Sequence, residues 1–197
     1  MTIKEFFSQE ITQDLVDYLL NLQVPPILIY NDKVLKVKVD VGDLTYGQWI
    51  ALCEMNVKTD YDFVRAIILL FHWKDIMGDK IFDLDNYELE MDWVDNCEIK
   101  SYYLVAKAYK ELVEKQRKLE TDTLNYIPKA EQAMAGVDRF NKYGFFGTLY
   151  NLGKEFGVKP TEILNWGYQE VFLCLQYEKD SNEFQEAYSN IIMNKSK

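Results

Sequence analysis

The sequence predicts an α+β fold that is mostly α-helical, with a small N-terminal β-hairpin, a helical body and a C-terminal pair of helices. Three observations point to this class. Apolar residues recur at intervals of three and four over most of the chain, which is the period of an amphipathic helix. Alternation typical of strands occurs only around residues 27–41. The chain has 197 residues, of which 48% are hydrophobic, so it can bury a core without a disulfide or a metal.

The first expected elements are a short helix and the hairpin. The hairpin pairs residues 27–30 with the alternating residues 34–41 across the turn-prone segment 31–33. Lysines alternate with valines in the second strand, so one of its faces should lie in water and the other on the core. The preceding helix is ended by two prolines, and its apolar face consists of Ile11, Leu15, Tyr18, Leu19 and Leu22.

Helical periodicity begins after residue 43. Thr45 and Gln48 have the spacing of a capping box, in which each side chain satisfies a backbone N–H at the start of a helix. This spacing predicts a helix over residues 45–55. A second helix is expected from Asp60 to Met77, where Gly78 ends it.

The segment 79–98 is strongly acidic, with eight acidic residues and a single lysine. A long helix is expected to start near Tyr87 or Asp92 and to run to Leu124. Its second half is too highly charged to be buried on all sides. The side chains expected to face inward are Tyr102, Val105, Ala106, Tyr109, Leu112, Val113 and Leu119.

Two further helical regions follow, over 137–156 and from Pro160 to about Asn194. Gly157 ends the first of them, as glycine commonly does just beyond a helix. Periodicity is lost between residues 120 and 136. We therefore expect an α+β module over 1–125, a connector over 126–136 and a helical module over 137–197, with one continuous helical body as the alternative.

Charge and composition limit the classes of molecule that this chain is expected to bind. The net charge is −10, and no block of lysine and arginine occurs, so neither nucleic acid nor an anionic membrane is expected as the main partner. The longest apolar run, 66–71, is too short to span a membrane. The three cysteines form no C-x-x-C pair, which favours a reducing compartment. We expect a cytoplasmic protein whose partners are other proteins.

No catalytic, cofactor-binding or metal-binding pattern is found, so we expect a protein that is not an enzyme. Residues 147–155 resemble a P-loop by eye, but the spacing is wrong and Glu155 replaces the magnesium-binding hydroxyl. The glycines there are expected to allow a bend or a close approach. His72, the only histidine, is expected to be a partly buried packing residue. The enzyme alternative is a magnesium site formed by Asp83, Asp85 and Glu88.

Two stretches resemble a known family. Residues 43–52 read D-L-T-Y-G-Q-W-I-A-L, with the pattern carried by Leu44, Thr45, Gly47, Gln48 and Trp49. Residues 140–147 and 162–179 add helices rich in aromatic residues. These stretches resemble the tail assembly chaperones and related morphogenesis proteins of tailed bacteriophages.

The resemblance implies a non-enzymatic, mainly helical factor that works in the host cytoplasm during virion assembly. Such a factor binds the hydrophobic helices of a tape-measure protein or of another virion or tail protein, or is itself retained in the virion. The acidic and helical stretch 79–124 departs from the family pattern, so a neck, tail or internal virion protein is the alternative. A second alternative is an acidic protein directed at a basic site on a host enzyme.

The candidate partner-binding residues lie in the last helical region. Tyr168, Val171, Phe172 and Leu175 form a stripe that the helix over 137–156 is expected to cover. After the polar residues 178–183, a second apolar group has little of the chain left to pack against, so another protein or a second copy is expected to cover it. The full set of candidates is Trp166, Tyr168, Phe172, Phe184, Tyr188, Ile191 and Ile192.

Overall fold

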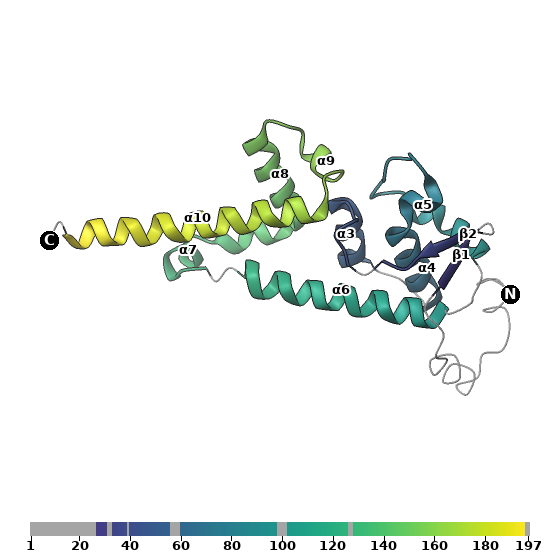
Figure 1. Cartoon of the computed structure of the whole chain (residues 1–197). Coiled ribbons are helices and arrows are strands. Elements are labelled where there is room, and N and C mark those ends of the chain that lie inside the picture. The colour runs from purple at the N-terminus through teal and green to yellow at the C-terminus, as the bar shows by residue number, and fades with distance from the viewer. Residues whose placement is uncertain are drawn as a thin grey trace.

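The computed structural model describes residues 27–30, 33–38, 40–55, 60–97, 102–125 and 128–195. The helix predicted over residues 11–22 lies outside them. The rest is mainly helical, with one two-stranded antiparallel hairpin, which confirms the predicted fold class (Figure 1).

The hairpin consists of β1 (Ile27–Tyr30) and β2 (Lys33–Lys36). Leu28 is paired with Leu35 and both are buried, whereas Val34 is exposed. One face of the sheet therefore covers the core, as predicted. The second strand is shorter than the predicted 34–41: within the described residues the pairing ends where Lys36 meets Ile27, the first described residue of β1.

Helix α3 (Tyr46–Glu54) starts with the predicted capping box. The Gln48 N–H donates to Thr45 Oγ1 (3.3 Å), and the Thr45 N–H donates to Gln48 Oε1 (2.7 Å). The single helix predicted from Asp60 to Met77 is instead two helices, α4 (Asp60–Phe71) and α5 (Trp73–Met77). The chain leaves helical geometry at His72, whose ring nitrogens lie within hydrogen-bond distance of Asp75 and Tyr109.

The acidic segment forms a short helix of its own, η1 (Tyr87–Asn96), a 3₁₀ helix. The long helix, α6 (Tyr102–Leu124), starts later than predicted. Arg65 on α4 binds two carboxylates of η1, and this holds the acidic segment against α4 instead of in line with α6.

Of the predicted inner face of α6, Val105, Tyr109 and Val113 are buried and Leu112 is half-buried, while the side chains of Tyr102 and Ala106 lie outside the described part of the chain. Leu119 was wrongly placed there and is 47% exposed. The helical period that runs through the buried positions continues to Gln116 and Glu120, so polar side chains face inward in the second half of the helix.

The C-terminal third contains α7 (Ala130–Met134), η2 (Val137–Tyr143), α8 (Phe145–Phe156), α9 (Pro160–Ile163) and α10 (Tyr168–Lys195). The helix predicted over 137–156 is divided at Gly144, which has a φ of +49°. Gly157, with a φ of +70°, ends α8 as predicted. Helix α10 continues through the polar residues 178–183 and projects beyond every other labelled element (Figure 1).

The buried side chains of the hairpin, α3, α4, α6, α8 and the start of α10 belong to one hydrophobic cluster. The first part of α10 therefore completes the core, while its later part extends away from it. The division of the chain at residues 126–136 stays a prediction, and α7 begins inside that segment.

Candidate functional site

The two segments that carry the family resemblance lie against each other. The chain that leads into α10 passes the first turn of α3 and satisfies N–H groups that have no partner within that helix. Thr45 also forms an isolated antiparallel bridge with Gly167. Three backbone hydrogen bonds of 2.8 Å join the segments: Tyr46 N–H to the Trp166 carbonyl, Gly47 N–H to the Leu164 carbonyl, and Tyr168 N–H to the Leu44 carbonyl.

Gly47 is required by this close approach. A Cβ atom at residue 47 would lie 3.0 Å from the backbone oxygen of Leu164 and 3.1 Å from the ring of Phe82. Both distances are shorter than ordinary van der Waals contact, and the oxygen belongs to backbone that is itself hydrogen-bonded to Gly47. The glycine of the motif thus permits the contact between the two segments.

We therefore expect Gly47→Ala to lower the free energy of unfolding by about 1–3 kcal/mol, the usual cost of overpacking. Gly147→Ala is the matched control, because a Cβ there meets no atom within 4 Å. Alanine in that helical position should stabilise the protein slightly. Urea unfolding followed by circular dichroism measures both changes, and equal stabilities of the two variants would contradict the close-approach argument.

Glu120, on α6, connects that helix with α3 and α10. The Trp49 Nε1–H and the Tyr168 hydroxyl both donate to Glu120 Oε1, at 2.9 Å and 3.0 Å. Gln116 Nε2 donates to the Tyr168 oxygen at 2.8 Å. Burial raises the pKa of Glu120, and the two donors act in the opposite direction. The carboxylate therefore fixes α3, α6 and α10 relative to one another.

Three of the predicted partner-binding residues belong to this packed region. Tyr168 and Phe172 are core residues, so their assignment to a partner surface was wrong. Trp166 is half-buried against the ring of Phe156, at a centroid distance of 5.2 Å. The helix over 137–156 was predicted to cover the apolar stripe at the start of α10. This was wrong in part, because α10 packs on α3 and α6 and not chiefly on the segment 137–156.

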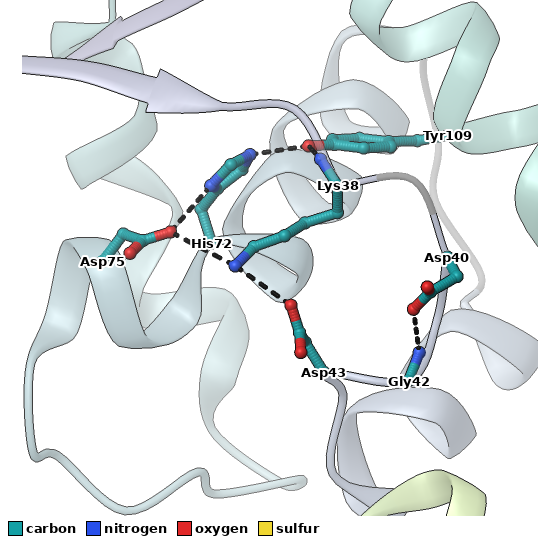
Figure 2. A network of polar contacts seen from close by, with 7 residues as sticks. All are labelled: Lys38, Asp40, Gly42, Asp43, His72, Asp75 and Tyr109. Atoms are coloured by element: carbon teal, nitrogen blue, oxygen red, sulfur yellow. Dashed lines mark hydrogen bonds and ion pairs between the residues drawn. The ribbon is translucent and has the colours of Figure 1, made fainter.

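His72 forms a second buried polar network (Figure 2). Its Nδ1 lies 3.0 Å from Asp75 Oδ2, and its Nε2 lies 2.6 Å from the Tyr109 oxygen. The Lys38 backbone N–H donates to the same tyrosine oxygen at 3.1 Å. Burial raises the pKa of Tyr109 to about 12, so the hydroxyl keeps its proton and donates it toward His72 Nε2. The neutral tautomer with Nδ1–H donating to Asp75 follows.

The environment keeps His72 uncharged at neutral pH. Burial lowers its pKa, and the neighbouring Asp75 only partly offsets this. The histidine side chain has no exposed surface, so a substrate has no access to its nitrogens. The predicted packing role is therefore correct, with the ring fully buried. The network joins the segment that follows β2, the α4–α5 break and α6.

The acidic segment is partly neutralised within the chain. Arg65 lies 2.7 Å from Asp92 and 2.9 Å from Asp95, and Lys80 pairs with Glu90. Asp83 accepts hydrogen bonds from the Asn86 side chain and the Asp85 N–H, which lower its pKa. Across the described ranges no three histidine, cysteine or acidic side chains gather to hold a metal ion. The structure therefore offers no support for the alternative of a magnesium site at Asp83, Asp85 and Glu88.

A small hollow lies between α3, α4 and α6. Its volume is about 130 Å³, and most of its wall is apolar. Three charged residues of α6 stand among its lining, which comprises Leu52, Met55, Phe63, Ile67, Lys110, Val113, Glu114 and Arg117.

The remaining predicted partner-binding residues lie on the projecting part of α10. All four are exposed: Phe184 by 63%, Tyr188 by 54%, Ile191 by 54% and Ile192 by 45%. The rings of Phe184 and Tyr188 stack at a centroid distance of 6.1 Å. Two exposed groups were missed from the sequence, namely Leu173 and Tyr177 on α10, and Phe140, Tyr143, Phe146 and Tyr150 on η2 and α8.

Comparisons with protein-family models, with curated proteins and with solved structures find no match for this chain. None of the helices in the described part of the chain is both long and apolar enough to cross a membrane.

Proposed function

We propose that this chain is a non-enzymatic assembly protein of a tailed-bacteriophage particle, and that it acts through protein contacts made by α10. The resemblance of residues 43–52 and 162–179 to tail assembly chaperones supports the phage context. The mutual docking of those two segments is consistent with their acting as one structural unit. The observation that carries the proposal is the exposed apolar surface on a projecting helix.

We call residues 177–195 the arm. Two polar contacts hold its first half, from Lys179 Nζ to the Thr123 carbonyl (2.6 Å) and between Lys129 and Glu186. Single exposed apolar residues are common on protein surfaces, but a contiguous apolar patch marks an interaction site. Helices in proteins are stabilised mainly by packing of an apolar face. A protein that covers the arm would therefore also stabilise it.

The acidic host-directed alternative is weaker on this geometry. A protein that occupies a basic site needs its carboxylates free for the partner. Three carboxylates of the segment 79–98 already bind cations of the same chain, namely Glu90, Asp92 and Asp95. Retention in the mature virion, as opposed to release after assembly, is an outcome that the following experiment distinguishes.

The test compares two variants of the tagged chain during infection of the host. Tyr188→Asp with Ile191→Asp places two charges on the exposed apolar face. Ser189→Asp with Asn190→Asp adds the same charge elsewhere on the same two turns. Large side chains at the centre of an interface each cost about 2 kcal/mol or more when they are lost, so the first variant, which replaces two of them, should bind its partner at least 100-fold more weakly.

The control variant should bind normally. Co-purified proteins are identified by mass spectrometry, and purified particles are analysed for the chain itself. The proposal is contradicted if no protein of the particle, the chain included, contacts the arm, or if both variants bind equally and assemble particles in equal yield.

A further inference from the structure

Helix α10 has two apolar faces on opposite sides. Tyr168, Val171 and Phe172 form the face that completes the core. The exposed residues Leu173, Tyr177, Phe184, Tyr188 and Ile191 are separated by four, seven, four and three positions. At about 100° per residue these five fall within an arc of roughly 60°, on the side of the helix opposite the core face. We call these five residues the outer stripe.

The size of the outer stripe suits a helix pair. From residue 173 to residue 191 it extends about 27 Å along the axis, at 1.5 Å per residue. Large side chains that are about half exposed each offer about 100 Å² for burial. Five of them, with the polar residues beside them, approach the roughly 800 Å² per partner that stable interfaces bury.

The outer stripe has one gap, at Asp180 and Ser181, between Tyr177 and Phe184. If two copies lie antiparallel about a point between residues 182 and 183, Phe184 of each faces the small Ser181 of the other. Tyr177 of each copy then faces Tyr188 of the other. A parallel pair would instead place gap on gap and Phe184 on Phe184. The stripe is thus complementary to itself in this antiparallel register and not in a parallel pair in register.

We infer that the outer stripe of α10 binds the outer stripe of a second copy of this chain, forming an antiparallel dimer with two-fold symmetry. This inference rests on the proposed function and names the partner of the arm. The same patch serves both copies, so each aromatic residue of the stripe contributes twice to the interface.

The first experiment measures the mass of the purified full-length chain in solution by sedimentation equilibrium. The expected mass is twice the 23.3 kDa of one chain. Phe184→Asp with Tyr188→Asp should give monomers, whereas the control Ser189→Asp with Asn190→Asp should remain dimeric. Circular dichroism verifies that both variants are folded. The inference is overturned if the wild-type chain is still monomeric at a concentration 100-fold higher than in the co-purification experiment.

The second experiment determines the orientation. Tyr177→Cys and Tyr188→Cys are made separately in a chain with Cys53→Ser and Cys174→Ser; Cys97 is buried and is retained. A short thiol cross-linker should join the two variants when they are mixed. Identical positions would lie about 16 Å apart, eleven residues along the axis, so neither variant should cross-link alone. Cross-linking of Tyr177→Cys by itself shows a parallel pair and contradicts the inference.

The outcomes separate this inference from the proposed function. A monomer that binds another particle protein through the arm overturns the dimer and leaves the function standing. A dimer with the predicted cross-link, whose stripe variants assemble particles in normal yield, supports the inference and overturns the function.

Discussion

Replacing Trp49 with alanine is expected to lower the free energy of unfolding by about 4 kcal/mol, within the range measured for large aromatic side chains in cores. Trp49 is 2% exposed, and its ring lies 4.8 Å from that of Tyr168. The variant loses this packing and also one of the two donors to Glu120. Both losses fall at the point where α3, α6 and α10 meet, so the whole fold is affected.

Two further variants separate the packing from the hydrogen bond. Trp49→Phe keeps an aromatic ring and removes the N–H, and it should cost clearly less than the alanine variant. Leu119→Ala, at an exposed position of α6, should change stability by less than about 0.5 kcal/mol. Denaturant unfolding at pH 7 measures all three. A loss below 1 kcal/mol for Trp49→Ala would contradict the central place of this contact.

Replacing His72 with leucine is expected to cost about 2–3 kcal/mol at pH 7.5. The change leaves the buried Tyr109 hydroxyl without its acceptor, and an unsatisfied buried polar group costs about 1–3 kcal/mol. Leucine also fills the flat imidazole site imperfectly. His72→Gln, which can still accept from Tyr109, should be the milder change.

The same variant tests the pH dependence. The pKa of His72 is lower in the folded chain than its usual 6.5, so the unfolded chain takes up a proton first. Stability should therefore fall as the pH decreases from 6.5 toward the folded pKa. The raised pKa of Glu120 acts with the opposite sign, since its contribution is lost as the pH rises through that value. His72→Leu keeps Glu120, so the difference between the two curves isolates the histidine.

The measurement is urea unfolding between pH 5 and pH 8. The wild type should lose more stability on acidification than His72→Leu does. Parallel curves for the two proteins would show that His72 does not titrate as its burial requires.

Local signals predicted the elements whose determinants are close in sequence. The capping box of Thr45 and Gln48, the stop at Gly157 and the hairpin around residues 31–33 each depend on a few neighbouring residues. The structure has the capping box and the stop at Gly157 where they were predicted, and it pairs residues 27–30 with a second strand that is shorter than predicted. The physical causes of the first two are satisfied N–H groups and a left-handed backbone, and the signal for the hairpin is the turn-prone composition of residues 31–33; each is visible in a window of about five residues.

These local signals could not predict contacts between residues that are far apart in the sequence. The partner of His72 is 37 positions away, and the partner of Trp49 is 71 positions away. The start of α6 was predicted too early because the acidic segment looks helical, while the cation that redirects it, Arg65, belongs to α4. Nothing in the local pattern of either segment indicates the pairing.

The residues predicted at the end of α10 are exposed, and their contact with a partner stays a prediction, whereas those at its beginning, Tyr168 and Phe172, are buried. Tyr168 and Phe172 have the same spacing as an exposed stripe, and a sequence pattern does not tell what covers a face. Leu173 and Tyr177 were missed because a helix with two opposite apolar faces presents no single clear stripe. The later residues Phe184, Tyr188 and Ile191 form the single apolar face of their part of the helix, so the sequence pattern was sufficient to predict it.

We propose that the exposed face of α10 contacts a protein during particle assembly. A photo-reactive phenylalanine analogue at Phe184, introduced into the chain in the infected host, tests it most directly. We expect cross-links to a protein of the particle or to a second copy of this chain, and far fewer from the same group at Ser189. Equal cross-linking from both positions, or none above background from residue 184, would contradict it.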